Sequence, residues 1–466
     1  MRIAILTDSP FLPTGYSNAA KQLVQHLCKL GHEVHWLAHA YTGVTLDFVR
    51  FEDGTEFSCK IHGQNMGDMY FNQSLAIKLK ELNIERFIIL LDTFMLYPWY
   101  LNVDTSPAKT YFWYPSDGGA GLPKGCDAIL KKMDVSVGMA KFAQKQVADY
   151  HGIKAEYIPL GLDPKRFYKL SDQDRNELRA KNGFADKFVI GVVARNQPRK
   201  ALDRTIKSMR LIADQIPEAV LFLHLDPKDP AAPWQIHELV KRYNLENRVV
   251  YSGMQAFKGL GWDKMNGIYN MMDCFLLTTT GEGFGIPIIE AMACEVPVVA
   301  TDYTTTPELV IENKAGLGID LAGVETIEMP LKMKKPVYKT VTEQIKVPIK
   351  KVYPQGYYVV DGEKKNFGKP IIEYEIEEVK KEVLVSPWES IGESLVDYDI
   401  KVMNGTMTGS WEVERGLCSI TDCAKKVKQI HDNPEEAKAM GLNGRKAVLE
   451  NYTFDIVGKA WEELLE

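Results

Sequence analysis

The stretch from 274 to 301 constrains the fold of this chain more than any other part of its sequence. An apolar run at 274–277 is typical of a buried parallel strand, and a glycine-rich turn follows it. Pro287 stands where a helix is expected to begin, and a second apolar strand is expected at 298–301. Strand, turn, helix and strand in this order predict a parallel β-α-β unit, with the turn at the carboxyl end of its first strand.

The glycine-rich turn also carries carboxylates at a spacing that suggests a ligand. It reads Gly-Glu-Gly-Phe-Gly-Ile-Pro from 281 to 287, and Glu290 is expected in the first turn of the helix. Ligands of open α/β sheets bind at the carboxyl ends of strands, where helix N-termini offer free N–H groups to anions. Because Glu282 and Glu290 can accept hydroxyl groups from one side, we predict a ligand rich in hydroxyls and phosphate, such as a nucleotide sugar. The alternative is that both carboxylates only stabilise a helix N-terminus.

The spacing Glu282-x7-Glu290, with Gly-Phe-Gly-x-Pro between, resembles family 4 of the retaining GT-B glycosyltransferases. That family includes sucrose synthase-like, glycogen synthase-like and mannosyltransferase-like enzymes. The resemblance implies that Glu282 lies beside the donor sugar, near its 3- and 4-hydroxyls. It also implies that the backbone N–H groups of Gly283, Phe284 and Gly285 support the sugar and diphosphate, and that Glu290 holds the nucleotide ribose.

A group of cations follows the strand expected at 188–194. The sequence Arg-Asn-Gln-Pro-Arg-Lys at 195–200 resembles the Arg-x4-Lys pair of the same family. Cleavage of a sugar–phosphate bond places negative charge on the leaving diphosphate, which fixed cations can stabilise. We therefore predict Arg195 and Lys200 as catalytic and donor-binding residues, with Arg199 as a further candidate; two ordinary surface cations are the alternative. No Asp-x-Asp metal motif stands at a matching position, so we expect no metal and no cofactor besides the sugar nucleotide.

The first part of the chain supplies weaker candidates. Gly15 lies in the first expected strand-to-helix loop, where the resemblance implies a glycine that approaches the diphosphate; a plain turn glycine is the alternative. Many relatives have a histidine after the strand expected at 110–114, but this chain continues Pro-Ser-Asp-Gly-Gly. Asp117 is therefore the candidate for contacting the sugar 6-hydroxyl or the acceptor. Asp92, at the end of the preceding strand, is a lesser one.

Strand and helix signals alternate along two long stretches, as in doubly wound parallel sheets. Strands are expected at 2–7, 33–38, 87–91, 110–114 and 135–137, and again at 188–194, 220–224, 249–252, 274–278 and 298–301. We expect an α/β fold of the GT-B type, in which two Rossmann-like domains face a central cleft. The resemblance implies an acceptor-side domain at 1–165, a donor domain at 166–453, and a last helix at 454–466 that crosses back to the first domain.

Residues 325–417 depart from this order. Polar and apolar residues alternate at 344–350 and 372–377, and a strand expected at 357–360 meets an Asp-Gly turn. We predict a β-rich insertion in the donor domain that either forms a homo-oligomer or frames the acceptor entrance. A surface decoration without either role is the alternative.

Composition limits the function further. A net charge of −6 argues against a general nucleic-acid binder, and seven scattered cysteines suggest reduced thiols rather than a disulfide framework. No apolar run approaches membrane-spanning length, so we expect a cytoplasmic protein, with peripheral membrane contact left open.

Together these patterns and the family resemblance imply a retaining, metal-independent glycosyltransferase that uses a UDP- or GDP-sugar. The acceptor, whether glycan, lipid or protein, is not identified. Two alternatives remain open: an NDP-sugar epimerase on the same fold, and a non-catalytic sugar-nucleotide-binding or scaffold protein. The epimerase would need acid and base groups facing C2 of the sugar, and none is apparent in the sequence.

Overall fold

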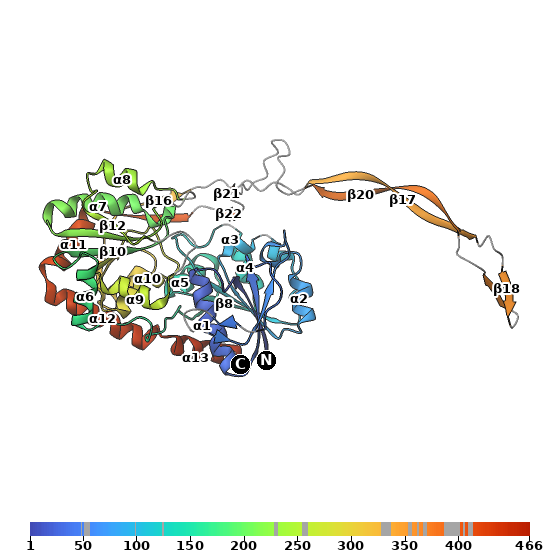
Figure 1. Cartoon of the computed structure of the whole chain (residues 1–466), viewed down its shortest axis with the longest axis horizontal. Helices are drawn as coiled ribbons and strands as arrows, with labels where there is room; N and C mark the ends of the chain where they lie inside the picture. The colour runs from blue at the N-terminus through green and yellow to red at the C-terminus, as the bar shows by residue number, and fades with distance from the viewer. Residues whose placement is uncertain are drawn as a thin grey trace. The chain divides into compact units, whose positions relative to one another are not determined.

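The computed structural model describes residues 1–47, 49–50, 56–97, 99–123, 125–227, 232–253, 260–327 and 413–466, together with strands between 337 and 408. The chain divides into two units, one made of 1–328 with 410–466 and the other of 329–409. The first unit contains two parallel sheets, each with helices on its faces (Figure 1). These sheets confirm the predicted fold class of two Rossmann-like α/β domains.

The first sheet is seven-stranded, with the order β5-β2-β1-β6-β7-β8-β9. Its strands are β1 (Arg2–Asp8), β2 (Glu33–His39), β5 (Lys60–Gly63), β6 (Arg86–Leu90), β7 (Lys109–Tyr114), β8 (Val135–Gly138) and β9 (Glu156–Tyr157). The helices of this domain are α1 (Gly15–Lys29), η1 (Met69–Phe71), α2 (Leu75–Glu81), α3 (Thr93–Leu96), η2 (Trp99–Asn102), α4 (Cys126–Lys132) and α5 (Lys141–His151), and a short pair, β3 (Val49–Arg50) and β4 (Glu56–Phe57), lies outside the sheet. Because helices cover both faces, the central strands β1, β6 and β7 are mainly apolar and buried.

The second sheet is six-stranded, with the order β12-β11-β10-β13-β14-β15. Its strands are β10 (Phe188–Val193), β11 (Ala219–His224), β12 (Val249–Tyr251), β13 (Cys274–Leu277), β14 (Val298–Thr301) and β15 (Gly316–Ile319). The helices around it are α6 (Asp172–Lys181), η3 (Pro198–Lys200), α7 (Leu202–Gln215), α8 (Ile236–Arg242), α9 (Trp262–Asn270), α10 (Ile286–Ala293), η4 (Pro307–Ile311), α11 (Ile420–Asp432) and α12 (Pro434–Asn451). Since β10 and β13 are neighbours, the cation-bearing loop and the glycine-rich turn leave the sheet side by side.

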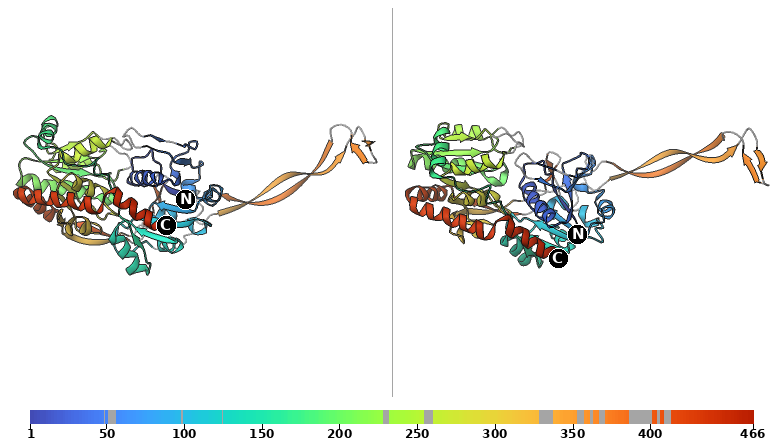
Figure 2. Two further views of the ribbon diagram at one scale, coloured as in Figure 1. Left: turned by 90° about the horizontal axis from the view of Figure 1, so that it is seen from below. Right: turned by 60° about the horizontal axis from the view of Figure 1, so that its bottom comes forward.

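The chain passes between the two sheets twice, and the two crossings lie side by side. The N–H of Leu162 donates to the carbonyl of Tyr452 at 2.9 Å, and the N–H of Phe454 donates to the carbonyl of Leu162 at 3.0 Å. The last helix, α13 (Phe454–Leu465), then packs on the first domain. There the buried Trp461 meets Trp113 edge to face, with ring centroids 5.2 Å apart. Figure 2 shows α12 and α13 running from the second domain to the first.

The segment between β15 and α11 is rich in β structure. Strand β16 (Leu321–Ile327) pairs with β23 (Val413–Cys418) in the first unit. In the second unit β17 (Val337–Val352) pairs with β20 (Ile371–Val385), β18 (Tyr357–Val360) with β19 (Glu363–Asn366), and β21 (Lys401–Met403) with β22 (Thr406–Thr408), all antiparallel. The alternating stretches at 344–350 and 372–377 lie within β17 and β20. The expected turn at Asp361-Gly362 lies outside the described residues, and the domain boundaries stay predictions.

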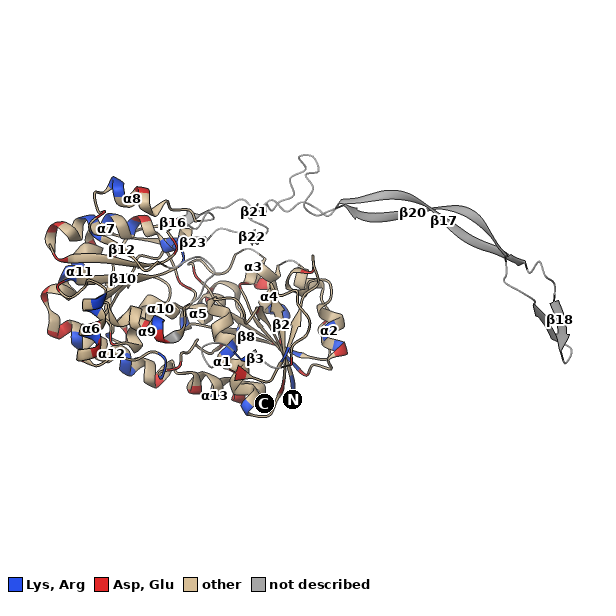
Figure 3. Ribbon diagram, viewed as in Figure 1, with Lys and Arg blue, Asp and Glu red and all other residues tan. Residues whose placement is uncertain are grey.

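Charge is distributed as expected for helices that face solvent. Lys and Arg alternate with Asp and Glu along α6, α7, α8 and α12, whereas the strands of both sheets carry few charges (Figure 3). Among the described residues, no helix is both long and apolar enough to span a membrane.

Candidate active site

The loop after β10 and the turn after β13 are joined by backbone and hydroxyl hydrogen bonds. The N–H of Thr280 donates to the carbonyl of Arg199 at 2.6 Å, and Thr278 Oγ1 donates to the carbonyl of Ala201 at 3.1 Å. Thr279 Oγ1 donates to the Arg199 carbonyl as well, at 3.1 Å. These bonds fix η3 against the turn, so the cations of η3 face Glu282.

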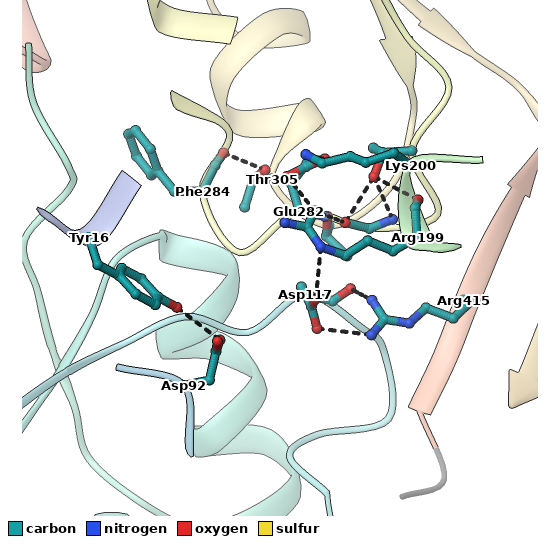
Figure 4. A network of polar contacts seen from close by, with 12 residues as sticks. Tyr16, Asp92, Asp117, Arg199, Lys200, Glu282, Phe284, Thr305 and Arg415 are labelled. Carbon is teal, nitrogen blue, oxygen red and sulfur yellow. Dashed lines mark hydrogen bonds and ion pairs between the residues drawn. The ribbon is translucent and has the colours of Figure 1, made fainter. Parts of the chain in front are cut away.

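Two cationic side chains form ion pairs with the carboxylate of Glu282. Lys200 Nζ lies 2.6 Å from Oε1, and Arg199 Nη1 lies 2.7 Å from Oε2 (Figure 4). Glu282 and Lys200 are only 3% and 6% exposed, so this is a buried ion pair in which each charge depends on its partner. Arg199 Nη1 also donates to the carbonyl of Gly281 at 3.2 Å.

The pKa values of this cluster keep it charged at neutral pH. Burial alone would raise the pKa of Glu282, but the charges of Arg199 and Lys200 outweigh it and lower that pKa to about 2. Burial and the neighbouring Arg199 lower the pKa of Lys200 to about 8, against the opposing effect of Glu282. At neutral pH Arg199 and Lys200 are therefore cations that attract anionic groups. Glu282 is an ionised carboxylate that accepts hydrogen bonds from hydroxyl groups.

The turn requires glycine because first-domain residues lie directly against it. Gly281 has φ +156°, and a Cβ there would lie 2.0 Å from the carbonyl oxygen of Asp117. A Cβ on Gly283 would lie 2.5 Å from the side chain of Pro115, and Gly285 has φ +103°. In the described part of the chain, no group accepts a hydrogen bond from the N–H of Gly283, Phe284 or Gly285. The predicted anion-binding N–H groups are thus available at the start of α10.

Glu290 lies in the second turn of α10, and its expected place in the first turn is wrong. The helix begins at Ile286 after the left-handed Gly285, which puts Pro287 in the first turn as predicted and Glu290 one turn later. The Glu290 carboxylate accepts a 2.5 Å hydrogen bond from the hydroxyl of Tyr269 on α9. Burial raises the pKa of Glu290 to about 7, although the Tyr269 hydrogen bond opposes the shift.

The first domain contributes its own polar side chains to the same region. Gly15 opens α1, where a Cβ would lie 3.1 Å from the side chain of Ile286 on α10. Asp117 follows β7, and its carboxylate pairs with Arg199 Nε at 3.6 Å and with Arg415 Nη2 at 3.2 Å. Asp92 accepts a 2.8 Å hydrogen bond from the Tyr16 hydroxyl; burial and the charge of Asp117 raise the pKa of Asp92 to about 6.

Some members of the site differ from those predicted from the sequence. Arg195 lies in the loop two residues after β10, in an exposed position, whereas Arg199, named only as a further candidate, is the arginine that contacts Glu282. Arg415 and Tyr269 were missed altogether. Tyr269 is indistinguishable in the sequence from a core aromatic residue of a helix, and Arg415 follows the insertion with no local motif around it. No group of three or more His, Cys, Asp or Glu among the described residues could hold a metal ion.

One protein-family model matches part of the second domain. Residues 174–328 match the family model for glycosyl transferases group 1. Mannosylfructose-phosphate synthase of Agrobacterium fabrum is 32% identical over 186 residues, which is 38% of either chain. A GDP-mannose-dependent alpha-(1-6)-phosphatidylinositol monomannoside mannosyltransferase of Mycolicibacterium smegmatis is 27% identical over 42% of this chain and 51% of its own. The matches thus span between about a third and a half of these relatives.

Solved structures match over the whole chain. Sucrose-phosphate synthase from Thermosynechococcus elongatus has a TM-score of 0.65 at 15% identity and covers 100% of this chain and 98% of its own. HepE of Anabaena in complex with UDP has a TM-score of 0.61 at 14% identity, over 100% of this chain and 99% of its own. At such identities the similarity concerns the fold alone, and the two parallel-sheet domains of this chain form a GT-B fold.

Proposed function

We propose that this protein is a retaining, metal-independent glycosyltransferase of family 4 that uses a UDP- or GDP-linked sugar. One observation carries the proposal: Lys200 and Arg199 converge on the buried Glu282 at the N–H-rich start of α10. This combination offers cations for a diphosphate and a carboxylate for sugar hydroxyls within one cluster. The names of the relatives support the donor class, since they include a GDP-mannose-dependent enzyme and a complex with UDP.

Donor binding follows from the chemistry of these groups. The N–H groups of Gly283, Phe284 and Gly285 would donate to the diphosphate or the sugar, and Lys200 and Arg199 would neutralise the charge of the diphosphate. Glu282 would accept hydroxyls of the sugar. Glu290 would accept the ribose hydroxyls, a role that requires Tyr269 to share or release the carboxylate.

The proposed reaction needs no strong base from the protein. The acceptor hydroxyl oxygen bonds to the anomeric carbon on the face that the diphosphate leaves, while the bond from that carbon to the phosphate oxygen breaks. The proton of the acceptor hydroxyl passes to the leaving phosphate oxygen, so atoms and charge balance. The contribution of the protein is orientation of the two substrates and stabilisation of the charge that develops on the diphosphate.

The test begins with donors alone. UDP- and GDP-sugars are screened for a rise in the melting temperature, because a ligand of the folded state raises its apparent stability. The stabilising donor is then incubated with candidate acceptors in EDTA, and the anomeric configuration of the product is read by NMR. We expect an α-linked product from an α-linked donor.

Four results would count against the proposal. An inverted product would refute retention, and loss of turnover in EDTA with rescue by a divalent cation would refute metal independence. Conversion of the donor to an epimer without any acceptor would favour the epimerase. Tight donor binding with no turnover for any acceptor, and no slow donor hydrolysis, would favour the non-catalytic binding protein.

A further inference from the structure

Strand β23 follows the insertion along the chain. It carries Arg415, which contacts the first domain. Arg415 Nη2 lies 3.2 Å from Asp117 Oδ1, and Arg415 Nη1 donates to the backbone carbonyl of Asp117. The residue before it adds a backbone link, since the N–H of Gly119 donates to the carbonyl of Glu414 at 3.1 Å. Tyr303, which follows β14, donates its hydroxyl to the same Glu414 carbonyl at 3.1 Å. Strand β23 is therefore hydrogen-bonded to the loop that carries Asp117, and Arg415 contacts Asp117 at two points.

Asp117 connects this arginine to the candidate active site. Its second carboxylate oxygen faces Arg199 Nε at 3.6 Å, while the other end of the Arg199 guanidinium bonds Glu282 at 2.7 Å. Charges thus alternate from Arg415 through Asp117 and Arg199 to Glu282 (Figure 4). Because Arg199 is contacted at both ends, the position of Asp117 affects how the guanidinium is oriented on Glu282.

The charge balance gives Arg415 a second effect. Arg199, Lys200 and Arg415 carry three positive charges and Asp117 and Glu282 two negative ones, so the five side chains sum to +1. Without Arg415 the sum is zero, and Asp117 would lose the cation that stands on its far side. Asp117 would then draw Arg199 away from Glu282 and from a bound diphosphate. The side chains of Arg415 and Asp117 are 16% and 38% exposed, so water screens part of this loss, and the expected consequence is a change in the orientation of Arg199 rather than unfolding.

We propose that Arg415 is a positioning residue of the donor site, which holds Asp117 so that Arg199 points at the diphosphate of the sugar nucleotide. This inference rests on the proposed function and extends it to a strand outside the motif-bearing region. Asp117 and Arg415 are 298 positions apart in the chain, and β23 begins directly after the segment that contains the second unit. The proposed donor site therefore includes a residue, Arg415, that follows the insertion in the sequence.

The experiment measures release of nucleoside diphosphate from the stabilising sugar nucleotide, by transfer or by hydrolysis, in four single variants and one double variant. Arg415→Ala removes the cation of the pair, and Asp117→Asn removes its carboxylate charge. Arg415→Lys keeps the positive charge but cannot contact the carboxylate and the backbone carbonyl of Asp117 with two separate nitrogens as arginine does. The control is Arg204→Met, because Arg204 bonds the carbonyl of Cys418 on the same strand at 2.7 Å but does not contact Asp117. Melting temperatures of all variants separate loss of folding from loss of turnover.

We expect Arg415→Ala to lower kcat by about 10- to 100-fold with a donor KM within about threefold of the original, since misorientation of a charge acts on the transition state. Asp117→Asn should cause a similar loss, Arg415→Lys should recover part of it, and Arg204→Met should leave kcat unchanged. The double variant of Arg415→Ala and Asp117→Asn should be no slower than the worse single one, because both act on one interaction.

The inference is overturned if the unmodified protein turns over donor and folded Arg415→Ala and Asp117→Asn do so at the same kcat. It is also overturned if the two losses multiply in the double variant. A protein that turns over no sugar nucleotide at all would instead refute the proposed function. If Arg415→Ala does not fold, Arg415→Lys and the near-isosteric Asp117→Asn decide the question.

Discussion

At the scale of single residues, burial gives several carboxylates unusual pKa values, and one of them joins the two domains. Glu308, on η4, is 7% exposed, and its Oε2 accepts the N–H of Phe142 at the start of α5 at 3.0 Å. Glu308 Oε1 is buried and has no hydrogen-bond partner in the described residues. Burial raises its pKa to about 7, against the opposing effects of the Phe142 N–H and Lys141. The folded protein therefore holds this proton to a higher pH than the unfolded chain does.

This difference predicts a pH dependence of stability. The folded pKa is about 7 and the ordinary value is 4.5, so the contribution of Glu308 to the free energy of unfolding is full below about pH 4.5 and is lost as pH rises to about 7. Glu308→Gln keeps the acceptor for Phe142 but cannot ionise. We expect this variant to be more stable than the original at pH 8, by up to about 3 kcal/mol, with the difference shrinking toward pH 5.

Urea unfolding at pH 5, 6, 7 and 8 checks the dependence on Glu308. The control is Glu238→Gln, because Glu238 is exposed on α8 and, unlike Glu312, is not among the charges that raise the pKa of Glu308. Equal stability of the original and Glu308→Gln at all four pH values would contradict the account of this carboxylate.

At the scale of elements, the turn between β13 and α10 depends on the first-domain loop against which it packs. Gly281→Ala would push a Cβ to within 2.0 Å of the Asp117 carbonyl at a φ that L-residues rarely adopt. We expect it to destabilise the protein by about 1–3 kcal/mol and to weaken donor binding. Gly267→Ala on α9 is the control, because its Cβ would meet only Leu178 at 3.5 Å and alanine favours a helix by up to about 1 kcal/mol. Urea unfolding and calorimetry with the donor measure both effects, and two equally stable variants would contradict the close approach.

The elements of the two sheets could be predicted because their signal is local. The apolar runs at 2–7 and 274–278 correspond to β1 and β13, and Pro287 marks the first turn of α10. Lys200 and Glu282 could be chosen because each stands in a short motif at the end of a strand. Arg415 could not be chosen, since its role depends on β23 returning to a loop far away in the chain. The roles of the chosen residues stay predictions until substrates are tested.

At the scale of the whole molecule, the C-terminal helix links the end of the chain to the first sheet. Trp461 is fully buried against Trp113 and Tyr111, and Arg86 Nε donates to the carbonyl of Leu465 at 3.0 Å. Trp461→Ala should cost about 3–5 kcal/mol of stability, because a large cavity would remain between α13 and the sheet. Lys459→Ala, on the exposed side of the same helix, should cost less than about 0.5 kcal/mol. Chemical unfolding compares the two, and a loss below about 1 kcal/mol for Trp461→Ala would show that α13 docks only weakly.

The central claim is that the cations on Glu282 stabilise the charge of a departing nucleoside diphosphate. Its most direct test is the rate of diphosphate release from the stabilising sugar nucleotide in EDTA, for the original protein and for Lys200→Ala. Lys200 Nζ lies 2.6 Å from Glu282, so its removal takes away one of the two cations of the cluster. The account predicts turnover by the original protein and a loss of about 100- to 1,000-fold in kcat for folded Lys200→Ala. Equal rates for the two proteins, or release that occurs only when a divalent cation is added, would contradict it.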